Sequence, residues 1–254
     1  MDDDLTTAPA PSAGLRASLS LLRRNRDFRA LFFASVISLG GDWFLWVAIN
    51  GLIFAETGEA LYVGLAILAQ EFAFFLASPV GGVLADRLDR RKLMIVCDLA
   101  RALICVAFLL VGRDTLWLAY VLLPLLASFA APFDPAFSAA TPNVVDPDDL
   151  PAANALNGSL WGTMLAVGAG LGGIVSAAFG ADTAFLVDAA SFLVSAALLS
   201  SIRRRFSESR RENTEHPSAV EATRETWRFA RRDHRVLSLL AVKFGFGAAA
   251  GLLA

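Results

Sequence analysis

Long runs of apolar residues, separated by short polar connectors, dominate this chain. A helix needs about 20 predominantly apolar residues to cross a lipid bilayer. Six runs meet that length, at roughly residues 29–54, 61–85, 93–112, 116–138, 153–178 and 184–202. We therefore expect an all-α membrane protein in which six transmembrane helices form one bundle.

Polar segments flank the six runs and define the remaining domains. Residues 1–27 are expected to form a cytoplasmic tail, with an amphipathic stretch near residues 15–22 at the membrane surface. Residues 203–235 are expected to form a cytoplasmic linker. A seventh apolar run begins near residue 236 and is still apolar at residue 254, so we expect the chain to stop inside a seventh transmembrane helix.

The composition supports this layout and gives it an orientation. Only 18% of the residues are charged, whereas soluble domains have roughly 25%. Three segments, namely the tail with Arg29 just after it, the turn at residues 87–92 and the linker, contain 19 of the 22 Lys and Arg residues. Positive residues mark the cytoplasmic side of a membrane protein. We therefore expect a multi-pass protein of the cell (inner) membrane with a cytoplasmic N-terminus.

Several function classes lack support in the sequence. Cys97 and Cys105 lie in one apolar run and indicate neither a disulfide framework nor a metal site. His216 and His234 have no nucleophile motif beside them, and no phosphate-binding Gly-x-x-x-x-Gly-Lys loop occurs. We expect no enzymatic activity, no cofactor and no metal; an intramembrane enzyme is the weakest alternative. Nucleic acid is not expected as a partner, because the basic residues lie between apolar spans.

A dense group of charges separates the second and third apolar runs. It contains Gly82, Asp86, Arg87, Arg90 and Arg91. A carboxylate at the end of one helix can cap the positive N-terminus of another helix or pair with an arginine. Such contacts can latch one conformation of a transporter and break in the other, so these residues are a candidate gating motif. A plain positive-inside anchor is the alternative, and it leaves Asp86 and Gly82 unexplained.

These residues, in the pattern Gly82-x-x-x-Asp86-Arg87-x-x-Arg90-Arg91, resemble the signature loop of the major facilitator superfamily. The Gly-rich segment at residues 168–173 is similar to the motif of antiporters in that family. The segments Leu39-Gly40-Gly41-Asp42-Trp43 and Asp188-Ala189-Ala190-Ser191-Phe192-Leu193 resemble its branch of enterobactin exporters and related drug-efflux proteins. The resemblance runs from about Phe28 to the end of the chain and covers the first half of the family's length.

The resemblance implies the N-terminal bundle of a secondary transporter that works by alternating access. Spacings of 90 residues between Gly82 and Gly172, and between Asp98 and Asp188, indicate a three-helix unit repeated in inverted orientation. The implied activity is export of a small amphiphilic molecule, siderophore or drug-like, against inward proton flow. The implied partners are membrane lipid, the small-molecule substrate, protons and a missing C-terminal half. An importer of the same fold and a half-length, non-transporting membrane subunit remain as alternatives.

Four charged residues inside the spans are further candidates. Asp42 and Glu71 lie well within the first and second runs, where an ionised acid costs roughly 3 kcal/mol. We expect them to bind a proton or contact substrate, or else to form a hydrogen bond to a neighbouring helix. Asp98 and Arg101, spaced i,i+3, are expected to form a supporting ion pair.

Glycines of the fifth run are expected to let a neighbouring helix approach closely: Gly168, Gly170, Gly172 and Gly173.

Overall fold

The computed structural model describes residues 11–204, 206, 228 and 238, and the regular structure in them is helical throughout. The predicted N-terminal tail is described from Pro11 onward. Most of the predicted linker and almost all of the seventh apolar run lie outside the described residues.

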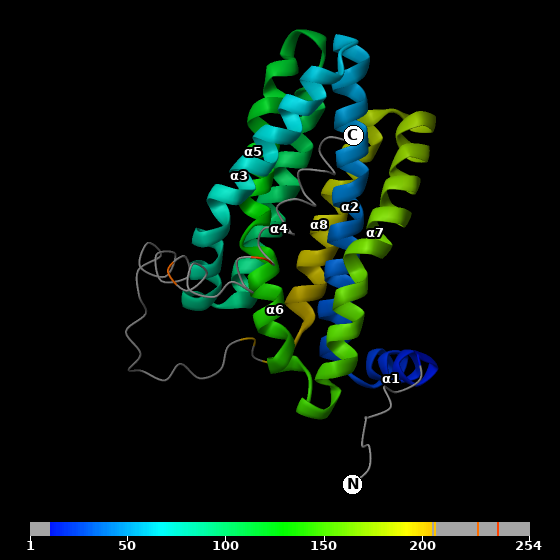
Figure 1. Ribbon diagram of the computed structural model, residues 1–254, viewed down its shortest axis with the longest axis vertical. Helices are drawn as coiled ribbons and strands as arrows, with labels where there is room; N and C mark the ends of the chain where they lie inside the picture. Colours follow the sequence, from blue (N-terminus) through cyan, green and yellow to red (C-terminus); the bar gives the residue numbers. More distant parts are fainter. Residues whose placement is uncertain (1–10, 205, 207–227, 229–237, 239–254) are drawn as a thin grey trace.

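Six helical segments are long and apolar enough to cross a membrane, which confirms the predicted fold class. The first three spans are α2 (Arg26–Thr57), α3 (Ala60–Arg87) and α4 (Arg90–Ala107), the last extended by the short 3-10 helix η1 (Phe108–Leu110). The fourth consists of η2 (Arg113–Leu118), α5 (Ala119–Ala130) and α6 (Phe133–Val144). The fifth and sixth are α7 (Leu150–Phe179), preceded by η3 (Pro147–Asp149), and α8 (Ala181–Ser201). A further short helix, α1 (Pro11–Arg24), lies across one end of this bundle (Figure 1).

Local sequence signals explain where several helices begin and end. The Asn25 side chain accepts a hydrogen bond from the backbone N–H of Phe28 (2.9 Å) and caps the start of α2. Asp89 caps α4 in the same way, through the backbone N–H of Lys92 (3.0 Å). Helix α2 ends at Gly58, whose φ of 71° is left-handed and suits a residue without a Cβ. These caps permit the tight turns between consecutive spans.

The fourth span is broken, although its hydropathy predicted one uninterrupted helix. Helix α5 ends at Ala130 and α6 begins at Phe133. Pro132 and Pro135 provide no backbone N–H, so the helical hydrogen-bond ladder is interrupted between them. Helix α3 packs directly on this break, because a Cβ at Gly81 would lie only 2.8 Å from the carbonyl oxygen of Ala131. Ala131 and Pro132 keep helical backbone angles, so the chain continues from α5 into α6 within one span.

Two apolar cores form the interior of the bundle. One lies near the end where α1 sits and includes Phe28, Met94 and Val144. The other lies toward the opposite end and includes Ile49, Phe108 and Phe185. Along α2, α4 and α8, a layer of buried polar and charged side chains separates the two cores. The fold therefore holds these side chains near the middle of the spans.

Helices α3 and α7 bury far less of their surface than the other spans. Only 6% of the apolar stretch of α3 and 11% of that of α7 is buried, against 39–50% in the other four spans. Large apolar side chains on them, among them Phe75 and Ile174, are exposed. In a membrane protein such faces contact lipid or another helical bundle.

Candidate functional site

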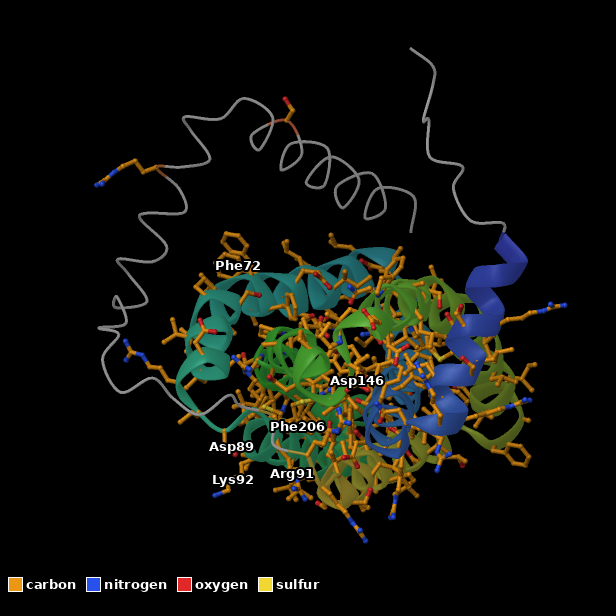
Figure 2. All side chains as sticks on the ribbon, turned by 90° about the horizontal axis from the view of Figure 1, so that it is seen from below. Phe72, Asp89, Arg91, Lys92, Asp146 and Phe206 are labelled. Atoms are coloured by element: carbon orange, nitrogen blue, oxygen red, sulfur yellow. The ribbon has the colours of Figure 1, made fainter. Side chains whose placement is uncertain are left out.

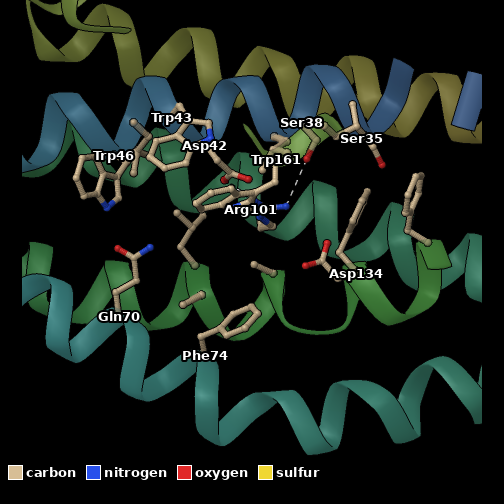
Figure 3. Close-up of a pocket in the computed structure, with 18 of the residues that line it drawn as sticks. Ser35, Ser38, Asp42, Trp43, Trp46, Gln70, Phe74, Arg101, Asp134 and Trp161 are labelled. Atoms are coloured by element: carbon tan, nitrogen blue, oxygen red, sulfur yellow. Dashed lines mark hydrogen bonds and ion pairs between the residues drawn. The ribbon is translucent and has the colours of Figure 1, made fainter. Parts of the chain in front are cut away.

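A cavity of about 770 Å³ opens between α2, α3, α5, α6 and α7. Asp42, Trp43 and Trp46 of α2 face Gln70 and Phe74 of α3 across it (Figure 3). The fourth span contributes the end of α5 and the start of α6, and α7 contributes residues 157–161 in its first half. Polar and aromatic side chains thus share one hollow in an otherwise apolar bundle, which is the usual composition of a small-molecule site.

The charged centre of this site is an ion pair between Asp42 of α2 and Arg101 of α4. The Arg101 guanidinium also donates to the Ser38 hydroxyl (3.4 Å) and stacks over the Phe192 ring, 4.0 Å from its centroid. Its side chain is only 4% exposed, whereas that of Asp42 is 29% exposed. Asp42 is therefore the more accessible member of the ion pair at the cavity wall, and Arg101 is buried behind it.

The prediction that Asp98 and Arg101 form an ion pair is wrong, because the structure does not contain this pair among its described residues. Arg101 pairs across the helix interface with Asp42 instead. Asp98 is fully buried, and neither of its carboxyl oxygens has a hydrogen-bond partner within the part of the chain that the structure describes. Spacing along one helix predicted the shared face correctly, but the long arginine side chain is aimed at α2 by Ser38 and Phe192.

A third carboxylate, Asp188 of α8, lies in the same polar layer. It is fully buried, and its oxygens accept hydrogen bonds from the Cys105 thiol (3.2 Å) and the Ser191 hydroxyl (3.1 Å). Helices α2 and α8 meet closely here, because a Cβ at Gly41 would overlap the Asp188 and Ser191 side chains. Asp42, Asp98 and Asp188 all lie close enough to act electrostatically on the single guanidinium of Arg101.

Two further acids line the cavity. Glu71, a sequence candidate, lies on α3 next to Gln70, and Asp134 lies in the first turn of α6. No ion pair involves either residue within the described ranges 11–204 and 206. The structure thus places the two candidates Asp42 and Glu71 on walls of one cavity, and their roles remain predictions.

Three tryptophans form the aromatic part of the wall. Trp43 packs edge-on against Trp46 (5.7 Å between ring centroids) and against Trp161 (6.2 Å). Sequence analysis missed Trp161, since nothing in the apolar run of α7 marks which side chains turn inward. Phe72 on α3, by contrast, is 59% exposed and points away from the bundle (Figure 2).

The four glycines of α7 differ in their surroundings. A Cβ at Gly168 would lie 2.9 Å from the Trp43 Cβ, and one at Gly172 would lie 2.8 Å from the Phe44 Cα. One at Gly173 would be in ordinary contact with Val47 (3.9 Å), and one at Gly170 would meet no atom of the described structure within 4 Å. Gly168 and Gly172, one helical turn apart, therefore face α2.

The candidate gating motif lies at the end of the bundle near α1. Arg90 donates to the backbone oxygens of Ala85 (3.3 Å), Ala139 (3.1 Å) and Phe206 (3.2 Å), and Arg91 donates to that of Ser200. These two arginines tie α3, α6 and α8 together.

The other members of the motif are placed differently. Asp86 is exposed and has no hydrogen bond or ion pair to residues that the structure describes. A Cβ on Gly82 would likewise meet no described atom within 4 Å. Asp86 and Gly82 are thus open to contacts from outside this bundle.

A second charged network at the same end was not expected from the sequence. Arg24 pairs with Asp149, and Arg204 pairs with Asp146 (3.3 Å). The Asp27 carboxylate accepts from the backbone N–H groups of Arg203 (3.3 Å) and Arg204 (3.0 Å). Viewed from below, Asp89, Arg91 and Lys92 lie at one edge of this end, and Asp146 lies nearer its middle (Figure 2). The acidic connector before α7 therefore lies among the basic segments.

Comparison with known proteins agrees with this architecture. The family model of the Major Facilitator Superfamily matches residues 31–254. The chain is 27% identical over 214 residues to the uncharacterized MFS-type transporter YfiS of Bacillus subtilis (strain 168), covering 84% of this chain and 51% of that protein.

The enterobactin exporter EntS is also similar. The protein of Citrobacter koseri is 34% identical over 195 residues (72% of this chain, 45% of the exporter), and that of Salmonella typhimurium is 36% identical over 174 residues (64% and 40%). The chain spans about half, or less, of the length of these relatives. The expected family and branch are confirmed, and this multi-pass membrane chain belongs to the Major Facilitator Superfamily.

Proposed function

We propose that this chain forms one helical bundle of a secondary active transporter that exports a small amphiphilic molecule in exchange for protons. The observation that supports the proposal most strongly is the Asp42–Arg101 pair at the wall of the cavity. A buried ion pair rarely adds stability, because desolvation offsets its Coulomb energy. Its presence between two apolar cores is therefore better explained by a functional role.

The cavity supports an amphiphilic substrate. Tryptophan faces favour an aromatic or aliphatic body, while carboxylates and Gln70 offer polar contacts. The relatives named as enterobactin exporters suggest a siderophore as one candidate, and a drug-like aromatic compound is the other. Asp42 and Glu71 are the proposed proton or substrate contacts.

The exposed faces of α3 and α7 suggest the remaining wall of the substrate path. We propose that a second helical bundle packs there, and that the two bundles rock to open the cavity to each side in turn. Gly82, Asp86 and Arg87 would contact that second bundle, while Arg90 and Arg91 hold their own bundle together. Breaking and remaking these contacts would accompany each transport cycle.

Everted membrane vesicles test this function. The protein, expressed as its gene encodes it, should load enterobactin or the aromatic dye ethidium when the vesicle interior is made acidic, and dissipating the pH gradient should stop loading. Asp42→Asn should abolish gradient-driven loading. Asp114→Asn, at an exposed position far from the cavity, is the matched control. Loading only when the gradient is reversed would indicate an importer, and no loading of either compound would count against the proposal.

A further inference from the structure

Asp98 is the buried charge that the proposed function leaves unexplained. Its side chain is 0% exposed, and both carboxyl oxygens lack a hydrogen-bond donor among the residues that are described. The Ser195 hydroxyl of α8 lies beside it and is the nearest neutral donor that could turn toward it, but the two form no hydrogen bond in this geometry. The nearest cation, Arg101, is engaged with Asp42.

The number of acidic and basic groups in this cluster indicates which carboxyl group is protonated. Three carboxylates, those of Asp42, Asp98 and Asp188, surround one guanidinium. An ionised carboxylate without a partner in an apolar interior costs several kcal/mol, whereas the neutral acid costs much less. Asp42 has Arg101, and Asp188 accepts from the Cys105 thiol and from the Ser191 hydroxyl, whose single hydrogen it shares with its own backbone oxygen. Asp98 has neither, so a neutral Asp98 fits this conformation best.

We propose that Asp98 is the proton-binding group of this bundle and that it competes with Asp42 for Arg101. Because Asp98 and Arg101 are one helical turn apart on α4, the guanidinium can reach either carboxylate. When Asp98 holds its proton, Arg101 pairs with Asp42 as observed. Asp98 does not itself line the cavity, but Arg101, one turn away, does. When the Asp98 O–H bond breaks, its proton passes to a water molecule that enters from the cavity beside Arg101, and the new carboxylate attracts Arg101 away from Asp42.

Among the described residues, the surroundings of Asp98 and Arg101 contain no second cation that could replace Arg101. Helix α8 contributes Asp188 and Ser195, α2 contributes Asp42, and α6 contributes Asp134. On α4 itself the neighbouring titratable groups are the buried thiols Cys97 and Cys105. Helix α5 has no Asp, Glu, Lys or Arg, and α3 has Glu71 at the cavity and Asp86 and Arg87 at its end. Arg101 is thus the single cation for which the carboxylates compete in this described part of the chain.

This competition would couple the proton to the charge of the cavity. With Asp98 protonated, Asp42 is neutralised by Arg101. With Asp98 ionised, Asp42, which is 29% exposed at the cavity wall, regains a free negative charge beside the three tryptophans. A lipophilic aromatic cation would then bind through the carboxylate and through cation–π contacts. This step rests on the proposed function, and it adds a cationic substrate class to it.

The protonation of Asp98 can be measured without transport. Infrared spectra of the purified protein, with and without ¹³C-labelled aspartate, reveal protonated Asp carboxyl groups by their C=O stretching band. The wild-type protein at neutral pH should show such a band, and Asp98→Asn should remove it. Asp42→Asn and Asp188→Asn, two isosteric controls, should retain it. Absence of the band in the wild type would overturn the proposal even if Asp98→Asn failed to fold, and so would its persistence in Asp98→Asn.

The competition for Arg101 has its own readout. Ethidium binding to the wild-type protein should tighten on the order of tenfold from acidic to alkaline pH, whereas Asp98→Asn should bind weakly at every pH. Binding of a neutral aromatic dye should not depend on pH in either protein. Equal pH dependence of ethidium binding in the wild type and in Asp98→Asn would contradict the competition. If the infrared and binding results hold but vesicles show no flux, the proposed transport fails and this inference stands.

Discussion

Arg101 is the residue that organises the centre of this bundle. From α4 it contacts two other helices at once: Asp42 and Ser38 on α2, and Phe192 on α8. A planar guanidinium can make an ion pair, a hydrogen bond and a ring contact together, which the point charge of a lysine cannot. Arg101 is therefore a buried cation whose positive charge stabilises negative charge on the nearby carboxylates Asp42, Asp98 and Asp188.

Removing this cation should leave the carboxylates unbalanced. We expect Arg101→Gln to destabilise the protein by about 3 kcal/mol, near the lower limit for a broken buried pair because Asp42 is partly exposed. Thermal unfolding in detergent, followed by size-exclusion chromatography, measures the change. Adding Asp42→Asn to Arg101→Gln should recover part of the loss, since it removes one unpaired charge. A double variant less stable than Arg101→Gln alone would argue against the pairing.

The sequence predicted which intramembrane charges matter better than it predicted their partners. Asp42, Asp98 and Arg101 stood out because charges inside apolar runs are costly. Their pairing depends on which helices are neighbours, and spacing along one helix contains no such information. The same limit explains why Trp161 was missed and why Asp188 emerged as part of the cluster only when α8 was seen against α2.

At the scale of elements, close helix contacts fix the position of α2. It lies between α8, which it meets at Gly41, and α7, which it meets at Gly168 and Gly172. Small residues let backbones approach where lipid provides no hydrophobic driving force. These contacts set the depth of Asp42 in the bundle, and hence its alignment with Arg101.

Two glycines of α7 offer a matched test of this packing. Gly172→Val should destabilise the bundle by about 1–3 kcal/mol, because the new side chain would meet the α2 backbone at Phe44. Gly170→Val should have little effect on stability, because its Cβ would enter open space. Thermal unfolding of the two variants distinguishes them. Equal losses would mean that α2 and α7 do not approach as described.

Hydropathy predicted the number of membrane-spanning segments correctly, but it did not predict that one of them is interrupted. All six apolar runs correspond to spans, yet the fourth is divided at Pro132. Prolines 132 and 135 were visible in the sequence, but their consequence depends on whether neighbouring groups stabilise the break. Gly81 of α3 fits against it. The role of Asp89 as the cap of α4 likewise depends on the local backbone geometry, which the sequence does not show.

At the scale of the whole molecule, charge separates the two ends of the bundle. The basic residues of α1, the α3–α4 turn and the segment after α8 lie at one end, joined by contacts such as Arg24–Asp149 and Arg204–Asp146. The turns around Gly58, Gly112 and Gly180 lie at the other (Figure 1). The positive-inside rule predicts that the basic end faces the cytoplasm.

Reporter fusions test this orientation. Tags inserted after Thr57, Arg113 or Asp182 should report the periplasmic or extracellular side, because these positions lie at the end that is poor in basic residues. A tag after Leu88 or Asp148 should report the cytoplasm. A cytoplasmic signal from all five positions would contradict the six-span layout.

The sequence could not predict which side chains of each helix point into the bundle. Helices α2, α3 and α8 are apolar around most of their circumference, so no stripe marks their inward face. The cavity and the exposed faces of α3 and α7 became visible only once the helices were packed. The family resemblance supplied the overall arrangement and left the charge pairing open.

The central claim, alternating access to the cavity, is tested most directly by cysteine accessibility. Gly158 lines the cavity, and a Cβ there meets no described atom within 4 Å, so Gly158→Cys should be tolerated. A membrane-impermeant maleimide should label it in both right-side-out and everted vesicles, and a pH gradient should shift the two labelling rates in opposite directions. Asp114→Cys, at an exposed position outside the cavity, and the wild type with its buried Cys97 and Cys105 are the controls. Labelling of Gly158→Cys from one side only, whatever the gradient, would contradict the account.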